Sequence, residues 1–166
     1  MTPSDVRDFW FAPASRERWF NSTPAFDASV RLVFGETWQQ ARDGQLSDWE
    51  SGPEGALALV IVLDQFPLNM YRGSDLQYST EAQSREVAAR AIERGFDGQL
   101  PRDRLAFLYL PFMHSESLAD QDRSVDLFER AGLESNLEFA RHHREIVRRF
   151  GRFPHRNDVL GRDSTA

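Results

Sequence analysis

The residues best suited to chemistry lie between Arg149 and Asn157, a stretch of three arginines, one histidine, one asparagine, two phenylalanines, one glycine and one proline. Gly151 and Pro154 stop the helical pattern that precedes them and restrict the backbone, so the polar side chains are held at a bend. Guanidinium and imidazole groups at a rigid bend are suited to binding a carboxylate or another anion. The same groups could instead tie one helical layer to another.

A second polar segment begins at Asp64, directly after the most apolar stretch of the chain. A carboxylate at the end of an apolar helix is unfavourable unless it is paired. We therefore expect Asp64 either to pair with a nearby arginine, such as Arg72, or to act as a buried acid. In the alternative interpretation, Asp64 and Asn69 satisfy backbone groups where Pro67 interrupts the helix.

His114 and Glu116 form a third segment, just after Pro111. If the segment stays helical, side chains two positions apart point in different directions. If the proline loosens the last turn, the two side chains could converge. The alternative is a structural histidine that is hydrogen-bonded at the end of an apolar helix.

The last predicted helix carries Glu138, His142 and Glu145 on one face. Arginines alternate with them, as on a salt-bridged solvent face. The Glu-x-x-His spacing that metal sites between paired helices use does not occur in this strip. We therefore expect no metal here. His143 points to the other side, towards Phe139, and is the more interesting histidine.

These segments supply candidates with polar side chains close to helix ends, and a common pocket requires the bend at Pro67 to meet the bend at 149–157. The catalytic candidates are His155, His114 and Asp64, and the ligand-binding candidates are Gln65, Asn69, Arg72, Glu116, His143, Arg152, Arg156 and Asn157. In this hypothesis Arg152 and Arg156 hold an anionic group while an imidazole acts as acid or base. The motifs of serine hydrolases, dinucleotide folds, zinc peptidases and P-loop proteins are absent, and we expect no cofactor.

The elements that must position these residues are predicted to be helices, because helical periodicity recurs and alternating strand patterns are almost missing. Ser4 or Asp5 is expected to cap a short first helix, and Thr23 to cap a long one that ends at Gly44. The other predicted elements are a short turn over 16–20 and helices over 53–66, 80–95, 101–112, 120–131 and 134–150. The helix over 53–66 is expected to end or kink before Pro67, and the helix over 80–95 to start with a capping box at Thr80.

The composition favours one domain over residues 1–166, since 40% hydrophobic residues can form a core. All 20 basic residues are arginine, so no lysine Schiff base or P-loop lysine can exist, and cysteine is absent. With 26 acidic residues the net charge is -6, which argues against nucleic-acid binding.

The start of the chain has no basic flank typical of a secretory signal, and the apolar run 56–63 is too short to span a bilayer. We expect a cytoplasmic protein.

Motifs along nearly the whole chain resemble one known family. They are Phe9-Trp10-Phe11, Trp19-Phe20, Leu63-Asp64-Gln65-Phe66-Pro67, Asn69, Arg72-Gly73, Tyr109-Leu110-Pro111-Phe112, His114-Ser115-Glu116, Arg149 to Asn157 and Leu160-Gly161-Arg162. The pattern is similar to the bacterial domain-of-unknown-function family nine-two-four. The resemblance implies an all-α fold of about six to eight helices in antiparallel hairpins, like tetratricopeptide repeats, and implies no reaction. Leu68 stands where the family usually has an arginine, which removes one polar donor of the expected pocket.

Three functions remain open at this point. The first is a site for a small anionic molecule, with or without catalysis. The second is a tetratricopeptide-like interaction module that binds a peptide carboxylate. The third is a purely structural network of arginines and acids. The apolar pair Leu32 and Val33 could also support a homo-oligomer.

Overall fold

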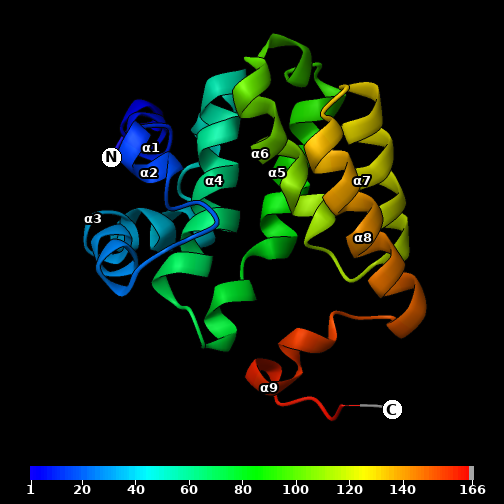
Figure 1. Cartoon of the computed structure of the whole chain (residues 1–166). Coiled ribbons are helices and arrows are strands. Elements are labelled where there is room, and N and C mark those ends of the chain that lie inside the picture. The colour runs from blue at the N-terminus through cyan, green and yellow to red at the C-terminus, as the bar shows by residue number, and fades with distance from the viewer. Residues whose placement is uncertain (165–166) are drawn as a thin grey trace. The chain divides into compact units, whose positions relative to one another are not determined.

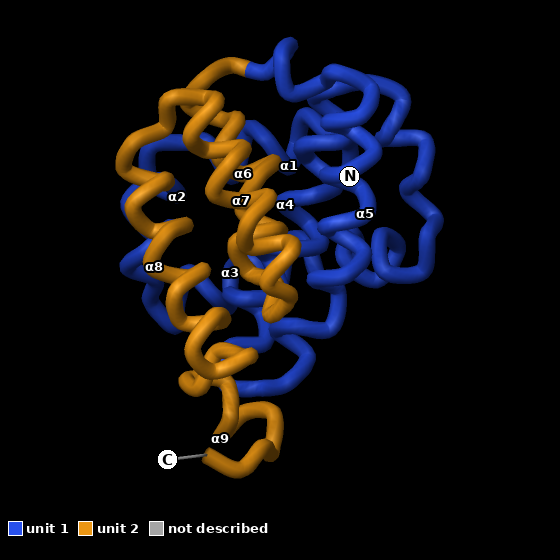
Figure 2. Tube along the Cα trace, turned by 90° about the vertical axis from the view of Figure 1, so that its right-hand side faces the viewer, with its two compact units in different colours: residues 1–100 blue, residues 101–166 orange. Residues whose placement is uncertain are grey.

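In the computed structural model, which describes residues 1–164, the chain folds into nine α-helices and four short 3-10 segments, without a strand (Figure 1). The predicted all-α fold is confirmed. The helices belong to two compact units, residues 1–100 and the residues from 101 onward, which are coloured separately in Figure 2.

Unit 1 is arranged around the central helix α4. Its α-helices are α1 (Pro3–Trp10), α2 (Pro13–Arg16), α3 (Pro24–Arg42), α4 (Pro53–Met70) and α5 (Glu81–Glu93), and its 3-10 segments are η1 (Ser47–Ser51), η2 (Asp75–Tyr78) and η3 (Asp97–Gln99). α4 packs against α1, α3, α5, η1 and η2. Because α4 is apolar all round, burying it on every side gives the unit its core.

The helix starts predicted for unit 1 are confirmed only in part. Thr23 caps α3 by accepting a hydrogen bond from the Phe26 N–H at 3.2 Å, as predicted. The predicted cap of the first helix is wrong: Thr2 caps α1, and the side chain of Asp5 completes a capping box with it. The short turn also comes earlier than predicted, at Pro13–Arg16, because Pro13 is suited to a first helical position.

Of the two outcomes predicted at Pro67, the end of the helix is wrong, because α4 continues to Met70, and the kink stays a prediction. Proline at 67 cannot donate the hydrogen bond that the Leu63 carbonyl would receive from it in a helix. The hydroxyl of Thr80 donates to the Leu63 carbonyl instead, at 2.6 Å, and accepts a bond from the Trp38 indole at 3.2 Å. Thr80 is therefore engaged with α4, and the capping box predicted for it does not form.

Unit 2 contains three longer helices and a C-terminal extension. They are α6 (Arg102–Met113), α7 (Leu118–Arg130), α8 (Glu134–Phe150), η4 (Pro154–Arg156) and α9 (Asn157–Leu160). α7 and α8 lie side by side as a helical hairpin, and α6 packs against both (Figure 1). α8 has the predicted bounds, whereas α7 starts two residues before the predicted 120. Gly151 ends α8 in the left-handed conformation, with φ 68°, which residues with a Cβ rarely adopt.

Within residues 1–164, none of the helices combines the length and the apolar character that crossing a membrane requires.

Candidate functional site

The bend that follows α8 is held in place by Glu116, from the loop between α6 and α7. Oε1 of Glu116 accepts a hydrogen bond from the Phe153 N–H at 2.8 Å. Arg162 adds two bonds to the same carboxylate, at 2.8 and 2.9 Å, and donates to the Phe153 carbonyl at 3.2 Å. Burial would raise the pKa of Glu116, but the bonds from Arg162 and Phe153 outweigh it and lower that pKa. Glu116 is therefore a charged anchor of the bend.

Arg156 supplies a second anchor. Its Nη2 donates to the carbonyl oxygen of His114 at 3.0 Å, and its guanidinium lies 4.9 Å from the centre of the Phe153 ring. Arg156 is buried, as is the Phe153 ring beneath it. We call the loop 114–117 together with residues 151–162 the elbow. Two arginines and one carboxylate fix its geometry.

Imidazole rings lie on both sides of the elbow's buried phenylalanine. The ring centre of Phe153 is 5.6 Å from that of His143 and 5.6 Å from that of His155. Nδ1 of His143 lies 2.7 Å from the Phe139 carbonyl. A carbonyl can only accept, so Nδ1 carries the proton of this bond and Nε2 of the neutral ring is left as an acceptor.

Burial and neighbouring basic side chains disfavour the protonated forms of these rings. Burial lowers the pKa of His143, and the imidazoles of His114, His142 and His155 lower it further, while the bond to the Phe139 carbonyl opposes them. Burial also lowers the pKa of His155, as do Arg156 and Arg162, whereas Glu116 opposes them. Both rings consequently favour the neutral form, and an anion placed beside them would favour the charged form.

Two polar side chains of the elbow lack internal partners. Arg152 is half-buried, and its guanidinium makes no hydrogen bond or ion pair with the rest of residues 1–164. Asn157 is buried, and within the same residues its Oδ1 accepts no hydrogen bond. A half-buried guanidinium without a counter-ion is suited to a carboxylate or phosphate, which its planar fork can bind through two hydrogen bonds.

The predicted candidates of unit 1 lie at the C-terminal end of α4 and just beyond it. Nε2 of Gln65 donates to the buried Asp64 carboxylate at 2.7 Å. Asn69 and Arg72 both donate to Asp27 near the start of α3, at 2.7 Å from Asn69 Nδ2 and 2.7 Å from Arg72 Nε. Burial would raise the pKa of Asp27, but the bonds from these residues lower it. The partner of Arg72 is therefore Asp27.

The structure thus brings the predicted candidates of unit 2 together at the elbow, and those of unit 1 together at the end of α4. The elbow group comprises His114, Glu116, His143, Arg152, His155, Arg156 and Asn157; the α4 group comprises Asp64, Gln65, Asn69 and Arg72. The expectation that the two groups form one pocket stays a prediction. Among residues 1–164, no group of three or more histidine, aspartate or glutamate side chains is placed to hold a metal ion.

Two residues that organise these groups were missed as candidates. Asp27 gave one local signal, an acidic side chain in the first turn after Thr23 and Pro24, which is typical of ordinary helix starts. Arg162 stands in a polar terminal stretch, and nothing near it in the sequence indicates its carboxylate partner. Both residues pair with distant parts of the chain: Asp27 and Arg72 are 45 positions apart, and Glu116 and Arg162 are 46 positions apart.

These features define an all-α protein with a histidine- and arginine-rich elbow. The chain belongs to the family described as bacterial protein of unknown function (DUF924), whose model matches residues 6–166. It is similar to a solved structure of a protein of unknown function from Agrobacterium tumefaciens, with 42% identity and a TM-score of 0.93, over 98% of this chain and 92% of that one. No curated protein matches the chain.

Proposed function

We propose that the elbow of unit 2 binds a small molecule through a carboxylate or phosphate group. The observation that carries the proposal is the pairing of Glu116 with Arg162 and the Phe153 N–H. Because this carboxylate is already hydrogen-bonded, Arg152 and the nearby imidazoles keep their capacity for an external anion. Arg152 would supply the bidentate hydrogen bonds, and His143 and His155 would add imidazolium donors.

The proton balance of the site supports the same function. His143 and His155 have lowered pKa values, so at neutral pH they are mainly uncharged. An anion stabilises the protonated rings, and binding is therefore coupled to proton uptake. The imidazoles of His155 and His114 are also groups that general acid–base catalysis would need, should the bound molecule react.

A peptide carboxylate would present the same chemistry, and one observation favours it as a second candidate. Phe139 and Phe150 of α8 are 62% and 44% exposed. They are eleven positions apart, which places them on one side of the helix, the side of His143. This apolar stripe could receive the side chains of a peptide whose terminal carboxylate reaches the elbow, as an interaction module of the tetratricopeptide type would.

The experiment is a titration followed by NMR of the histidine ring protons. The probes are inorganic phosphate, acetate, a short apolar peptide with a free C-terminus and the same peptide with an amidated C-terminus. Phosphate or acetate binding should raise the pKa values of His143 and His155. Acetate, whose charge is constant in this range, should bind more tightly as the pH falls from about 7.5 to about 6. If the peptide with a free C-terminus binds more tightly than acetate and loses this affinity on amidation, the ligand is a peptide carboxylate. If the free peptide binds no more tightly than acetate, the ligand is a small anion.

Two variants provide the matched comparison. Arg152→Gln should weaken phosphate binding by roughly tenfold, as expected for losing a charge-assisted hydrogen bond. Arg149→Gln removes the same charge from an exposed side chain that lies over the Phe150 ring, and should change binding less than about twofold. Equal effects of the two variants, or histidine pKa values that no probe moves, would refute an anion site at the elbow.

A further inference from the structure

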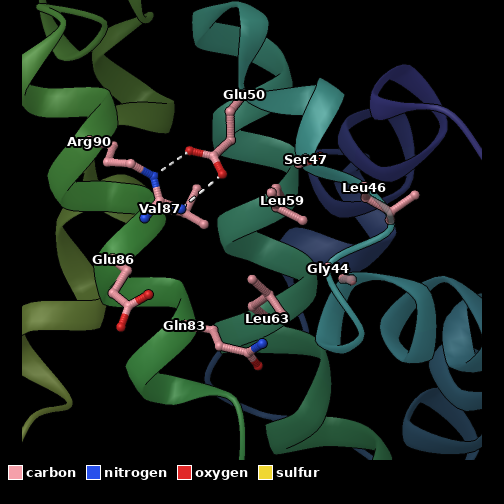
Figure 3. Close-up of a pocket in the computed structure, with 11 residues that line it drawn as sticks. Gly44, Leu46, Ser47, Glu50, Leu59, Leu63, Gln83, Glu86, Val87 and Arg90 are labelled. Carbon is pink, nitrogen blue, oxygen red and sulfur yellow. Dashed lines mark hydrogen bonds and ion pairs between the residues drawn. The ribbon is translucent and has the colours of Figure 1, made fainter.

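Unit 1 contains a cleft of about 190 Å³ that is lined by none of the candidate residues discussed so far. Figure 3 shows that α4 forms its floor with Leu59 and Leu63, while α5 and the segment 44–50 form its sides. Leu46 and Val87 extend the apolar lining on these two sides. At water's liquid share of about 30 Å³ per molecule, the volume equals roughly six waters, which suits a ligand the size of a small fragment.

The end of the cleft near η1 is closed by an ion pair. η1 approaches the first turn of α4 closely because residue 55 is glycine; any Cβ there would collide with the Trp49 carbonyl oxygen. This approach places Glu50 opposite α5, where Nε and Nη2 of Arg90 donate to its two carboxylate oxygens at 2.8 and 2.9 Å (Figure 3). Arg94 donates to the Glu50 carbonyl at 2.6 Å and holds the segment further.

The polar groups that remain at the rim are acceptors. Gln83 uses its Nε2 to bond the Arg42 carbonyl at 2.8 Å, which leaves its Oε1 as an acceptor. Glu86 is exposed and makes no hydrogen bond or ion pair within residues 1–164, apart from its longer-range attraction to Arg90. Among the described residues that line the cleft, Arg90 alone is positively charged, and both oxygens of Glu50 already engage it.

We propose that this cleft binds a small molecule with an apolar body and a protonated amine. The body would cover Leu59 and Leu63, which exclude water from one side of the ligand, and the ammonium group would face the Glu86 carboxylate. A neutral ligand would leave that acceptor unmatched, and a carboxylate ligand would be repelled by it. The overall net charge of -6 also raises the local concentration of cations near the protein. The proposal is independent of the anion site, since it uses none of its residues.

The test measures binding of three probes of similar size to the whole chain: benzylamine, benzyl alcohol and benzoate. Shifts of the methyl resonances of Leu59, Leu63 and Val87 report occupation of the cleft. We expect benzylamine to bind most tightly, benzyl alcohol more weakly and benzoate least. Equal affinity for all three probes, or no shift of these methyl groups with any of them, would overturn the proposal.

A pair of charge-neutralising variants on α5 assigns the selectivity. Glu86→Gln should reduce benzylamine affinity by roughly two- to fivefold, the range for an exposed ion pair, and should leave benzyl alcohol unaffected. Glu93→Gln removes an exposed carboxylate that also acts on Arg90 but does not line the cleft, so it should leave both affinities unchanged. Identical responses of the two variants would show that the preference for amines comes from net charge and not from this cleft.

Discussion

The end of α4 in unit 1 and the elbow in unit 2 are both built from arginines, acids and a proline, yet their polar groups are used differently. At the end of α4, Asp27 receives hydrogen bonds from Ser22, Asn69 and Arg72, and the hydroxyl of Thr80 serves the Leu63 carbonyl. These bonds join α3, α4 and the start of α5 within one unit. The network has the character of a structural joint.

The elbow contains a similar hydrogen-bonded network, but not all of its hydrogen-bond donors take part in that network. Glu116, Arg162 and Arg156 fix the bend around Phe153. Arg152 lies in the same bend and is not part of the network. An arginine-rich helix end is therefore not in itself a binding site; the distinction is whether the same unit already supplies a partner for each guanidinium, as it does for Arg156.

The largest effect should come from Thr80→Val, which tests the structural character of the α4 end. The valine has nearly the same shape but cannot donate to the Leu63 carbonyl or accept from the Trp38 indole, and both groups are buried. We expect a loss of about 2–4 kcal/mol in the free energy of unfolding, measured by urea denaturation. Thr80→Ser keeps the hydroxyl and should lose less than half as much. A valine variant as stable as the parent would show that Pro67 needs no substitute donor.

A smaller loss of stability, combined with a loss of binding, is expected for Glu116→Gln. The amide oxygen can still accept from the Phe153 N–H, but the charge that holds Arg162 is gone. Because both side chains are partly exposed, we expect about 1–2 kcal/mol in the free energy of unfolding, together with weaker phosphate binding at the elbow. Glu138→Gln, an exposed position on α8, should change neither quantity. Unchanged phosphate binding in the folded Glu116→Gln protein would separate the joint from the site.

Local signals in the sequence predicted the helices well where the residues that start and stop them are neighbours in the chain. Thr23 followed by Pro24 fixed the start of α3, and Gly151 fixed the end of α8. The continuation of α4 through Pro67 could not be predicted in this way. The donor that makes it possible, Thr80, comes from the next helix, 17 residues further on.

The candidate site was predictable as a set of residue types but not as a set of pairs. The density of arginine and histidine around Gly151 and Pro154 correctly marked a bend with a fixed geometry. Which arginine neutralises which acid depends on contacts between distant segments, and Arg72 and Glu116 took partners that spacing does not reveal. The cleft of unit 1 had no sequence signal, because the residues that line it come from separate segments of the chain.

The smallest effect we predict is a change in the pH dependence of stability, which distinguishes the elbow from the end of α4. The pKa of His143 is lowered in the folded protein by burial and by the neighbouring imidazoles. The unfolded chain therefore binds more protons at this residue, and the free energy of unfolding falls as the pH drops below about 6.5. The amide of Gln at position 143 can still donate to the Phe139 carbonyl. His143→Gln should therefore reduce the loss of unfolding free energy between about pH 7.5 and pH 5 by less than about 1 kcal/mol.

Urea denaturation between about pH 7.5 and pH 5 measures this slope, and the exposed His142→Gln gives a comparison on the same helix. His142 is one of the imidazoles that lower the pKa of His143, so this variant should also make the fall shallower, but by less than His143→Gln does. Phosphate extends the comparison. An anion at the elbow favours the protonated imidazoles, so saturating phosphate should reduce the slope of the parent protein. It should reduce the slope of the His143→Gln variant less, because only His155 then responds. If phosphate altered both slopes equally, its effect would come from sites elsewhere on the chain, and the elbow would be a structural joint of the same kind as the end of α4.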